Sequence, residues 1–366
     1  MTRTRLIVVT ALCFLAHALP AAADDGAFYG LLRERDLTPF GFLRLDMRPA
    51  HAVTIEPGTW AIETSLGYQN TWALSKEVET YLKSLEPTGR RHIGPAEVQA
   101  IEDLPGENYL LDIETALFDF TFHYKLAPKW SLYGIVSAIT YQGGFLDSTI
   151  EEFHSTFGFD DFGRPAVAKN QATLIYDLKG AHTVFLEKPT DGGLTDPTFG
   201  VRYGPWQLSQ RWQLSLEGAV KIPVGGKRLL LSTGRTDVGM QASFQRFGNH
   251  HAFYVDLAAV YYDGAAEPAP QDRQVIPTLV FGYERKLTAR TNVNLQGYVS
   301  QSVYSHDQTD LDELLGPKYQ YSIGVRHLLE SNVLLSFGFT ENLQNLNNTP
   351  DIGFQFGVAW IPHRAK

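Results

Sequence analysis

The chain has 366 residues, a formal net charge of −9, and aromatic side chains at 12% of its positions. That length suffices for one large domain or two ordinary ones, and the negative charge argues against nucleic acid as a partner. No window after the N-terminus holds eighteen consecutive apolar residues, so the sequence predicts no membrane-spanning helix.

The chain begins like an exported protein. Two arginines precede an apolar run at 6–19, and three alanines follow at 21–23. A basic start, a short apolar stretch and a small-residue exit are typical of a secretory signal peptide, so residues 1–23 are predicted to be removed. The only cysteine, Cys13, lies inside that stretch. The mature chain would then have no disulfide, which a large barrel does not need.

Residues 24–58 form an arm that is rich in charge and proline and shows no regular alternation. Its arginines Arg33, Arg35, Arg44 and Arg48 lie in two charged patches. Such an arm can lie in the periplasm as a linker, or it can fold into the lumen of a barrel as a plug. The sequence leaves both readings open.

From residue 59 onward, segments alternate large apolar side chains with small or polar ones. The strand at 351–362 shows this best, because Phe354, Phe356 and Val358 share one face and Gln355 lies on the other. In an outer-membrane barrel the apolar face contacts lipid and the other face lines the lumen. Strands of this kind are predicted at 59–73, 109–126, 129–143, 195–208, 211–225, 236–247, 250–264, 275–288, 292–305, 318–328, 332–343 and 351–362.

The connections between these strands alternate between tight turns and longer loops. The tight turns are at 126–129, 208–211, 247–250, 288–292 and 328–332. Bacterial barrels have short periplasmic turns and longer external loops. We therefore expect the short turns and both chain ends on the periplasmic side, and the two longest loops, 74–108 and 144–194, on the exterior.

Both long loops carry local structure in their sequences. Loop 74–108 has two helical patterns, the second beginning at Pro95, because proline suits the first helical position. Loop 144–194 has a short helical pattern, with Ser148 and Glu151 at capping-box spacing and Gly158 as its terminator. A polar hairpin at about 171–187 follows it.

The helical pattern of the second loop is the best loop candidate for a functional element. Its candidate residues are Asp147, Glu151, Phe153, His154 and Phe157. Together with neighbouring phenylalanines they predict an aromatic cluster. Such a cluster could constrict a pore or hold an apolar ligand, or it could only pack the loop onto the barrel rim.

Aromatic residues are sorted by strand end. Five of the six tryptophans lie at strand ends assigned to the periplasmic rim, at Trp60, Trp130, Trp206, Trp212 and Trp360. Tyrosines gather at the opposite ends, at Tyr141, Tyr261, Tyr262, Tyr304 and Tyr319. Aromatic belts at both interfaces are expected of a membrane protein. The predicted fold is therefore an all-β, antiparallel, up-and-down transmembrane barrel of about 12 strands, spanning residues 59–366 and surrounded by outer-membrane lipid.

The inner face of this barrel is expected to carry charges of both signs. The lumen-lining candidates are Glu63, Asp112, Glu114, Asp119, His123, Lys125, Arg202, Glu217, Lys221, Asp256, Glu284, Lys286 and Arg326. Acids outnumber lysines and arginines there by seven to five. That surplus could pair with the arginines of the arm if the arm enters the lumen. A barrel of eight strands is filled by side chains and one of sixteen encloses an aqueous channel. Twelve strands lie between these cases, so the strand number alone does not decide whether the lumen is open.

Several stretches of the chain resemble the proteobacterial outer-membrane family catalogued as domain of unknown function 3187. The resemblance rests on Arg35–Phe40, Pro57–Trp60, Gly144–Asp147 and Phe153–His154. It implies an outer-membrane barrel, which the barrel-assembly machinery would insert, and it supplies no activity or functional residues. Many such barrels resemble each other in ending on an aromatic residue, whereas here six residues follow Trp360.

No motif in the sequence indicates an enzyme. The chain has neither a Gly-x-Ser-x-Gly elbow nor a His-Glu-x-x-His pair, and we expect no metal and no cofactor. The sequence favours a channel or passive transporter for small solutes in the cell outer membrane. The alternatives are a closed structural or interaction barrel and a lipid-modifying enzyme of the outer membrane.

Overall fold

The computed structural model describes residues 27–38, 43–49, 55–179, 181–262, 274–330, 332–342, 348–349 and 351–362. The predicted signal peptide with its cysteine, positions 39–40 of the family resemblance, and residues 363–366 lie outside these ranges. Among the described residues, no helix is long and apolar enough to cross a membrane.

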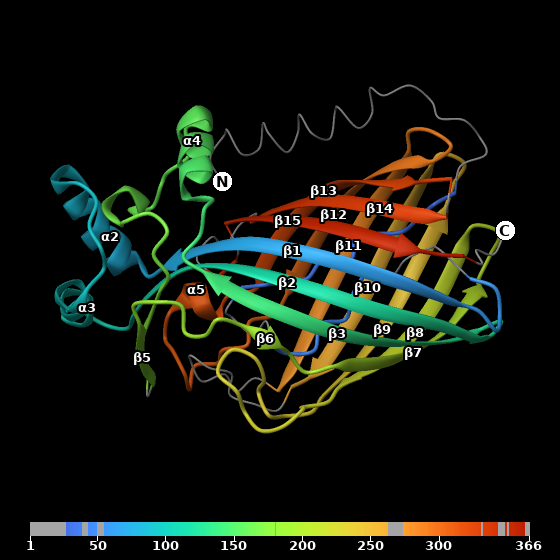
Figure 1. The fold of residues 1–366 in the computed structure, drawn as a ribbon, viewed down its shortest axis with the longest axis horizontal. Helices are drawn as coiled ribbons and strands as arrows, with labels where there is room; N and C mark the ends of the chain where they lie inside the picture. The colour runs from blue at the N-terminus through green and yellow to red at the C-terminus, as the bar shows by residue number, and fades with distance from the viewer. Residues whose placement is uncertain are drawn as a thin grey trace.

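Twelve antiparallel strands form a closed barrel (Figure 1), which confirms the predicted fold class. Its strands are β1 (Trp60–Leu74), β2 (Asn108–Ala127), β3 (Trp130–Gln142), β7 (Thr198–Gln207), β8 (Trp212–Lys221), β9 (Asp237–Phe247), β10 (His251–Tyr261), β11 (Val275–Lys286), β12 (Thr291–Ser300), β13 (Lys318–Leu328), β14 (Val333–Asn342) and β15 (Ile352–Trp360). Pairing of β1 with β15, where Ile62 is opposite Trp360, closes the wall. Closure leaves no unpaired strand edge, which a sheet in lipid requires.

The period-two pattern places the apolar side chains on the outside. Phe356 is 53% exposed on the outer face, whereas its neighbour Gln355 points inward. At the short-turn end, Trp60 and Trp360 meet edge to face with ring centroids 5.2 Å apart. Three of the tyrosines expected in the opposite belt are instead buried against inner-face residues and loops: Tyr141, Tyr262 and Tyr304.

At the long-loop end, β1 and β2 continue as a sheet extension. There β4 (Thr173–Leu178) pairs with β2, and β5 (Ala181–Phe185) pairs with β4, at the position of the predicted hairpin. Both predicted helices of the first long loop are present, as α2 (Lys76–Leu85) and α3 (Pro95–Glu102). The remaining short elements are η1 (Glu86–Thr88), α4 (Asp147–Phe157), η2 (Arg164–Ala166), β6 (Gly193–Leu194) and α5 (Asp312–Leu315).

The two faces of this extension bury different clusters. One face packs Trp72 and Leu110 against Val78 of α2 and Ile101 of α3. The other face, continuous with the inside of the barrel, belongs to an apolar cap. That cap combines arm, wall and loop residues: Leu37, Leu43, Leu111, Ile139, Tyr141, Leu174, Leu230, Ile276, Val303, Tyr304 and Leu314. Apolar side chains therefore cover the long-loop end of the lumen.

Candidate functional site in the barrel lumen

The first part of the arm, residues 27–38, lies against the inner wall. The amides of Tyr29 and Gly30 donate to the Glu284 carboxylate at 2.7 and 3.0 Å. The Gln296 side chain accepts from the Leu32 amide at 2.9 Å and donates to the Leu32 carbonyl at 3.2 Å. Side chains of β11 and β12 thus satisfy backbone groups of the arm without any strand pairing.

The second part of the arm, residues 43–49, lies against other strands. Lys221 of β8 donates to the Leu43 carbonyl at 2.6 Å, and the Leu45 amide donates to Asp237 of β9 at 2.7 Å. The backbone of the two parts is held by two pairs of wall strands, β11–β12 and β8–β9, with β10 between them. Together the two parts occupy the inside of the barrel as two passes of the chain.

The arginines of the arm meet acceptors on the wall or within the arm. Arg33 lies 3.3 Å from Glu63, and Arg35 lies 3.2 Å from Asp119. Arg48 also pairs with Asp119, which therefore serves two guanidinium groups. Arg44 donates to the hydroxyls of Tyr298 and Ser300 at 3.0 and 3.3 Å. Removing one partner of such buried pairs would leave an uncompensated charge.

Most of the lumen candidates lie on the inner face of the wall. These are Glu63, Asp119, His123, Lys125, Arg202, Glu217, Lys221, Asp256, Glu284, Lys286 and Arg326. Several form pairs with one another or with neighbouring wall residues: Arg202 lies 2.6 Å from Glu217, and Lys221 lies 2.9 Å from Asp237. The lumen is therefore an ion-pair network as well as a polar surface.

The predicted inner face is wrong for two candidates, Asp112 and Glu114. They share strand parity with Phe118 and Phe120, which are 45% and 40% exposed on the outer wall. Because side chains alternate along a strand, both carboxylates point to the outer side of β2. Without them, the inner acids among the candidates number five against five lysines and arginines, so the predicted acidic surplus disappears.

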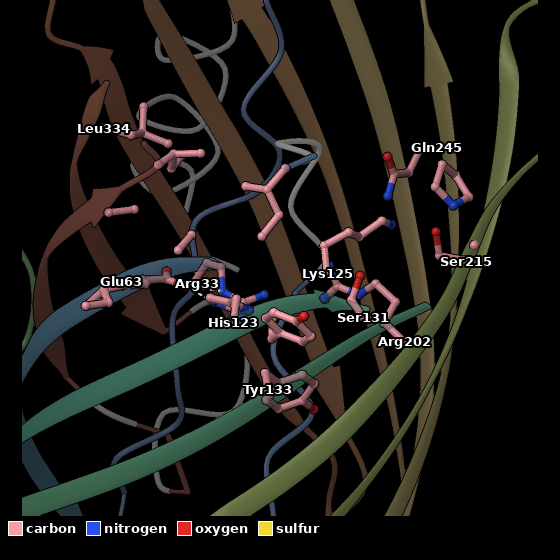
Figure 2. A pocket seen from close by; sticks show the side chains of 18 of the residues that line it. Arg33, Glu63, His123, Lys125, Ser131, Tyr133, Arg202, Ser215, Gln245 and Leu334 are labelled. Carbon is pink, nitrogen blue, oxygen red and sulfur yellow. Dashed lines mark hydrogen bonds and ion pairs between the residues drawn. The ribbon is translucent and has the colours of Figure 1, made fainter. Parts of the chain in front are cut away.

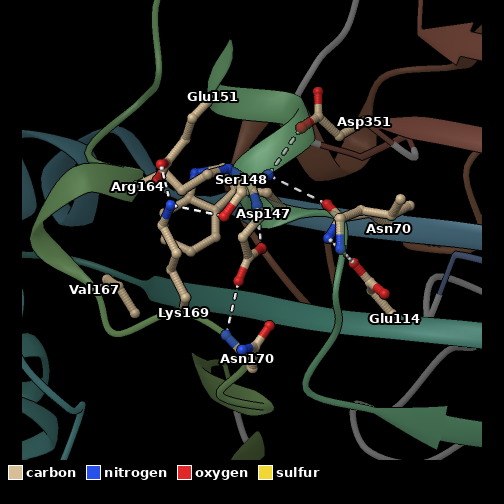
Figure 3. Close-up of polar contacts among 12 residues, drawn as sticks. Asn70, Glu114, Asp147, Ser148, Glu151, Arg164, Val167, Lys169, Asn170 and Asp351 are labelled. Atoms are coloured by element: carbon tan, nitrogen blue, oxygen red, sulfur yellow. Dashed lines mark hydrogen bonds and ion pairs between the residues drawn. The ribbon is translucent and has the colours of Figure 1, made fainter. Parts of the chain in front are cut away.

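Glu114 is buried because a loop covers it on the outer side (Figure 3). It accepts hydrogen bonds from the amides of Phe145 and Leu146 at 3.0 and 2.9 Å, and from Asn70 at 3.2 Å. The Tyr68 hydroxyl also donates to it. The carboxylate thus binds the chain entering α4 and fixes that helix to the outer wall.

Arg164 makes the second attachment of this loop, and no pattern in the sequence indicates it. Its guanidinium lies 2.9 Å from Asp147 and 2.8 Å from Asp351, and it donates to Asn70 at 3.2 Å. It also lies 4.8 Å from the centre of the Trp72 ring. Its partners come from three distant parts of the chain, so no local spacing could reveal it.

Two of the five loop candidates of α4, Asp147 and His154, serve this attachment. Asp147 and His154 are buried with Ile150 on the face of α4 that meets the wall, whereas Phe153 and Phe157 are not among the buried residues of the helix. Those two rings contact each other at a tilt of 48°, with centroids 4.8 Å apart, and Phe157 is exposed. The helix lies on the outer wall, because Leu146 and Ile150 pack on Ile352, and it does not constrict the lumen.

The ends of α4 show one correct and one incorrect expectation. Gly158 terminates the helix in the left-handed conformation, with φ of 70°, as predicted. Ser148 does not cap it; its hydroxyl accepts from Lys169 at 2.9 Å, and the helix begins at Asp147. Burial would raise the pKa of Glu151, but hydrogen bonds from Arg90 and Lys169 outweigh burial and lower it.

A cavity of about 90 Å³ lies in the lumen at the short-turn end (Figure 2). Its charged lining consists of Arg33, Glu63, Lys125, Arg202 and Arg326. His123 and apolar, hydroxyl and amide side chains complete the wall. Among the described residues, no cluster of histidine, cysteine and carboxylate side chains is arranged to hold a metal ion.

Comparison with known proteins places this geometry in a family. The model of the family described as "Protein of unknown function (DUF3187)" matches residues 104–360. A search of curated proteins gave no match.

Solved structures resemble the fold. An outer membrane channel from Pseudomonas putida F1 superposes with a TM-score of 0.51 at 9% identity, over 86% of this chain and 99% of that one. The NanC porin gives 0.42 at 6% identity, over 82% and 98% of the two chains. The toluene transporter TbuX of Ralstonia pickettii gives 0.39 at 9% identity, over 94% and 99%. At 9% identity, the similarity to the Pseudomonas putida channel concerns the fold alone. The two lower TM-scores carry no further conclusion.

Proposed function

The chain belongs to the DUF3187 family, and from that premise we propose that it is an outer-membrane channel for small solutes, closed by its own N-terminal arm. The short turns face the periplasm and the two long loops face the exterior. The barrel wall supplies the path, and the two described parts of the arm, residues 27–38 and 43–49, block it in the form described above. The solute enters or leaves when the arm moves aside.

The observation that carries this proposal is how the arm is attached. Its described residues take no part in the barrel's strand ladder, because β1 pairs directly with β15. The arm is held by wall side chains, such as Glu284 and Gln296 at its backbone and Asp119 at its arginines. Withdrawal of the arm would break these contacts and leave every strand pair of the wall intact.

The wall exposed by such a withdrawal would be polar. Amide and hydroxyl side chains line it between the ion pairs, including Asn294, Gln296 and Ser322. Water can hydrogen-bond to these groups, so the open lumen would hold a hydrated path. A wall meant only to be packed by apolar residues would not need them.

Deletion of residues 27–48 tests the proposal. The truncated and full-length proteins, refolded in parallel, are compared for single-channel conductance in planar bilayers. Heat-resistant mobility on gels serves as the check that each barrel is folded. We expect the deletion to raise conductance. We expect no strong cation preference from the wall carboxylates, since the inner candidates balance at five and five. Equal conductance of the two folded proteins would contradict the arm as the plug.

A closed structural barrel is the second candidate, favoured by the apolar cap. That cap contains Leu111 of the wall extension and Leu230 and Tyr304 of the loops, besides Leu37 of the arm. Deletion of the arm would leave much of it in place. A folded but silent barrel in both forms would support this candidate. The lipid-modifying enzyme gains no support from any contact described above.

A further inference from the structure

We propose that the cavity at the short-turn end binds a small organic carboxylate, with the Lys125 ammonium as its principal partner. The claim that small organic carboxylates pass through the barrel rests on the proposed function. The claim that the closed protein binds such a carboxylate in this cavity does not depend on whether the barrel conducts. Three features of the cavity support the proposal: an unpaired lysine, a surplus of positive charge, and an apolar wall.

Lys125 differs from the other lysines of the inner wall. Lys221 lies 2.9 Å from Asp237, and Lys318 lies 2.7 Å from Asp36. Lys125 is 6% exposed, and its side chain extends into the cavity (Figure 2). Within the described ranges, its ammonium has neither a hydrogen-bond acceptor nor a carboxylate partner. A buried ammonium without a partner is unfavourable, so an anion entering the cavity would gain from binding it.

The neighbouring charges add to this attraction. Arg33 and Arg202 are paired with Glu63 and Glu217, respectively. Arg326 donates instead to neutral acceptors, the carbonyls of Tyr29 and Leu31 at 2.6 and 3.0 Å and the Ser336 hydroxyl.

The residues that line the cavity thus carry an excess of cations, four against the one carboxylate of Glu63; Glu217, Asp256 and Glu284 act on these cations from outside the lining. A low-dielectric wall strengthens the attraction that this excess exerts on an anion.

The remaining lining favours an organic anion over an inorganic one. Ile55, Ala61, Leu334 and Ile361 form an apolar group at the short-turn end, and all four line the cavity. A carboxylate with a short apolar body would cover this group while its oxygens meet Lys125. The volume of about 90 Å³ corresponds to roughly six to nine water-sized groups, which suits a small monocarboxylate.

Calorimetric titration of the full-length protein in detergent tests the site, with benzoate as the probe. Benzyl alcohol supplies a neutral molecule of similar shape, and inorganic phosphate supplies an anion without an apolar body. We expect saturable benzoate binding, with both comparison ligands at least about tenfold weaker. Lys125→Met should weaken benzoate binding about tenfold to a hundredfold, the usual range for a charge-assisted hydrogen bond. Lys125→Arg, which keeps the charge, should retain most of it.

The matched control is Lys129→Met, because it makes the same change at an exposed lysine of the same hairpin. It should bind benzoate as the unaltered protein does. Equal benzoate binding by the Lys125→Met and Lys129→Met proteins, both with heat-resistant mobility, would overturn the proposal. Equal affinity for benzoate and benzyl alcohol would reduce the site to an apolar pocket, and tighter phosphate binding would refute the organic class. Benzoate binding by a barrel that never conducts would keep the site and refute the channel.

Discussion

The arm inside the barrel and the α4 loop outside it are attached to opposite faces of the same strand. Asp119 on the inner face of β2 pairs with Arg35 and Arg48 of the arm. Glu114, five positions earlier on the outer face, accepts the backbone amides that lead into α4. One strand therefore uses two buried carboxylates to hold two separate segments, one against each side.

The arm takes the place of water inside the barrel, whereas the α4 loop takes the place of lipid outside it. Inside the barrel, the arm occupies space that water would otherwise fill, and charged partners come from both wall and arm. Outside, the α4 loop covers a part of the wall where polar side chains such as Glu114 and Asn70 could not face lipid. Further along β2, toward the short turns, the outer face returns to Phe118, Phe120 and Phe122. The height at which the outer face becomes polar thus marks where a loop takes over from lipid.

Removal of the Asp119 charge should have the largest effect, because two arginines lose a partner at once. Asp119→Asn leaves Arg48 buried without a carboxylate, and breaking a buried pair costs about 3–5 kcal/mol. Unfolding by denaturant in detergent should show this loss, and protease should cleave the arm sooner. Glu330→Gln, which breaks an exposed pair with Arg290, is the control and should leave both measurements unchanged. Unaltered stability of the Asp119→Asn protein would show that the arm is not held by charge.

The arm and the α4 loop also differ in how far the sequence could predict their attachments. The strands and their lipid-facing side chains could be predicted from a period of two, because lipid on one side of the wall imposes this alternation along the whole strand. The short turns are the breaks between these alternating segments. Glu114 shares strand parity with Phe118, so the inner face predicted for it from its charge is wrong. Arg164 could not be found, since its partner Asp351 is 187 positions away and no periodic pattern joins them. The arginines of the arm could be anticipated because buried charges need partners, but their individual carboxylates could not.

The difference between inner and outer faces can be measured at adjacent positions of β15. Phe356→Arg places a guanidinium on the lipid face, at a cost of about 2–4 kcal/mol near mid-bilayer. Gln355 donates to the Arg33 carbonyl at 2.8 Å on the inner face, and an arginine there could still donate to it. Gln355→Arg should therefore cost less. Equal loss of heat-resistant mobility in both variants would contradict the assignment of the two faces.

The smallest and most local effect is expected at Glu114. Glu114→Gln removes the charge and leaves one oxygen to accept from the amides of Phe145 and Leu146. Weakening a buried hydrogen bond to a charged group costs about 1–3 kcal/mol. Because the contact lies outside the barrel, this cost should open the loop without loosening the arm. Hydrogen exchange of the amides at 145–158 should accelerate, while exchange in residues 27–38 stays unchanged.

Glu152→Gln is the matched control for this variant, because it makes the same change at an exposed position of α4. It should leave exchange at 145–158 as it was. The reciprocal experiment uses the Asp119→Asn protein, in which the amides of the arm should exchange faster and those of the α4 loop should not. Acceleration of both segments in both variants would mean that arm and loop open together. The two carboxylates of β2 would then act as one coupled attachment, because the strand between them would transmit the loss of either.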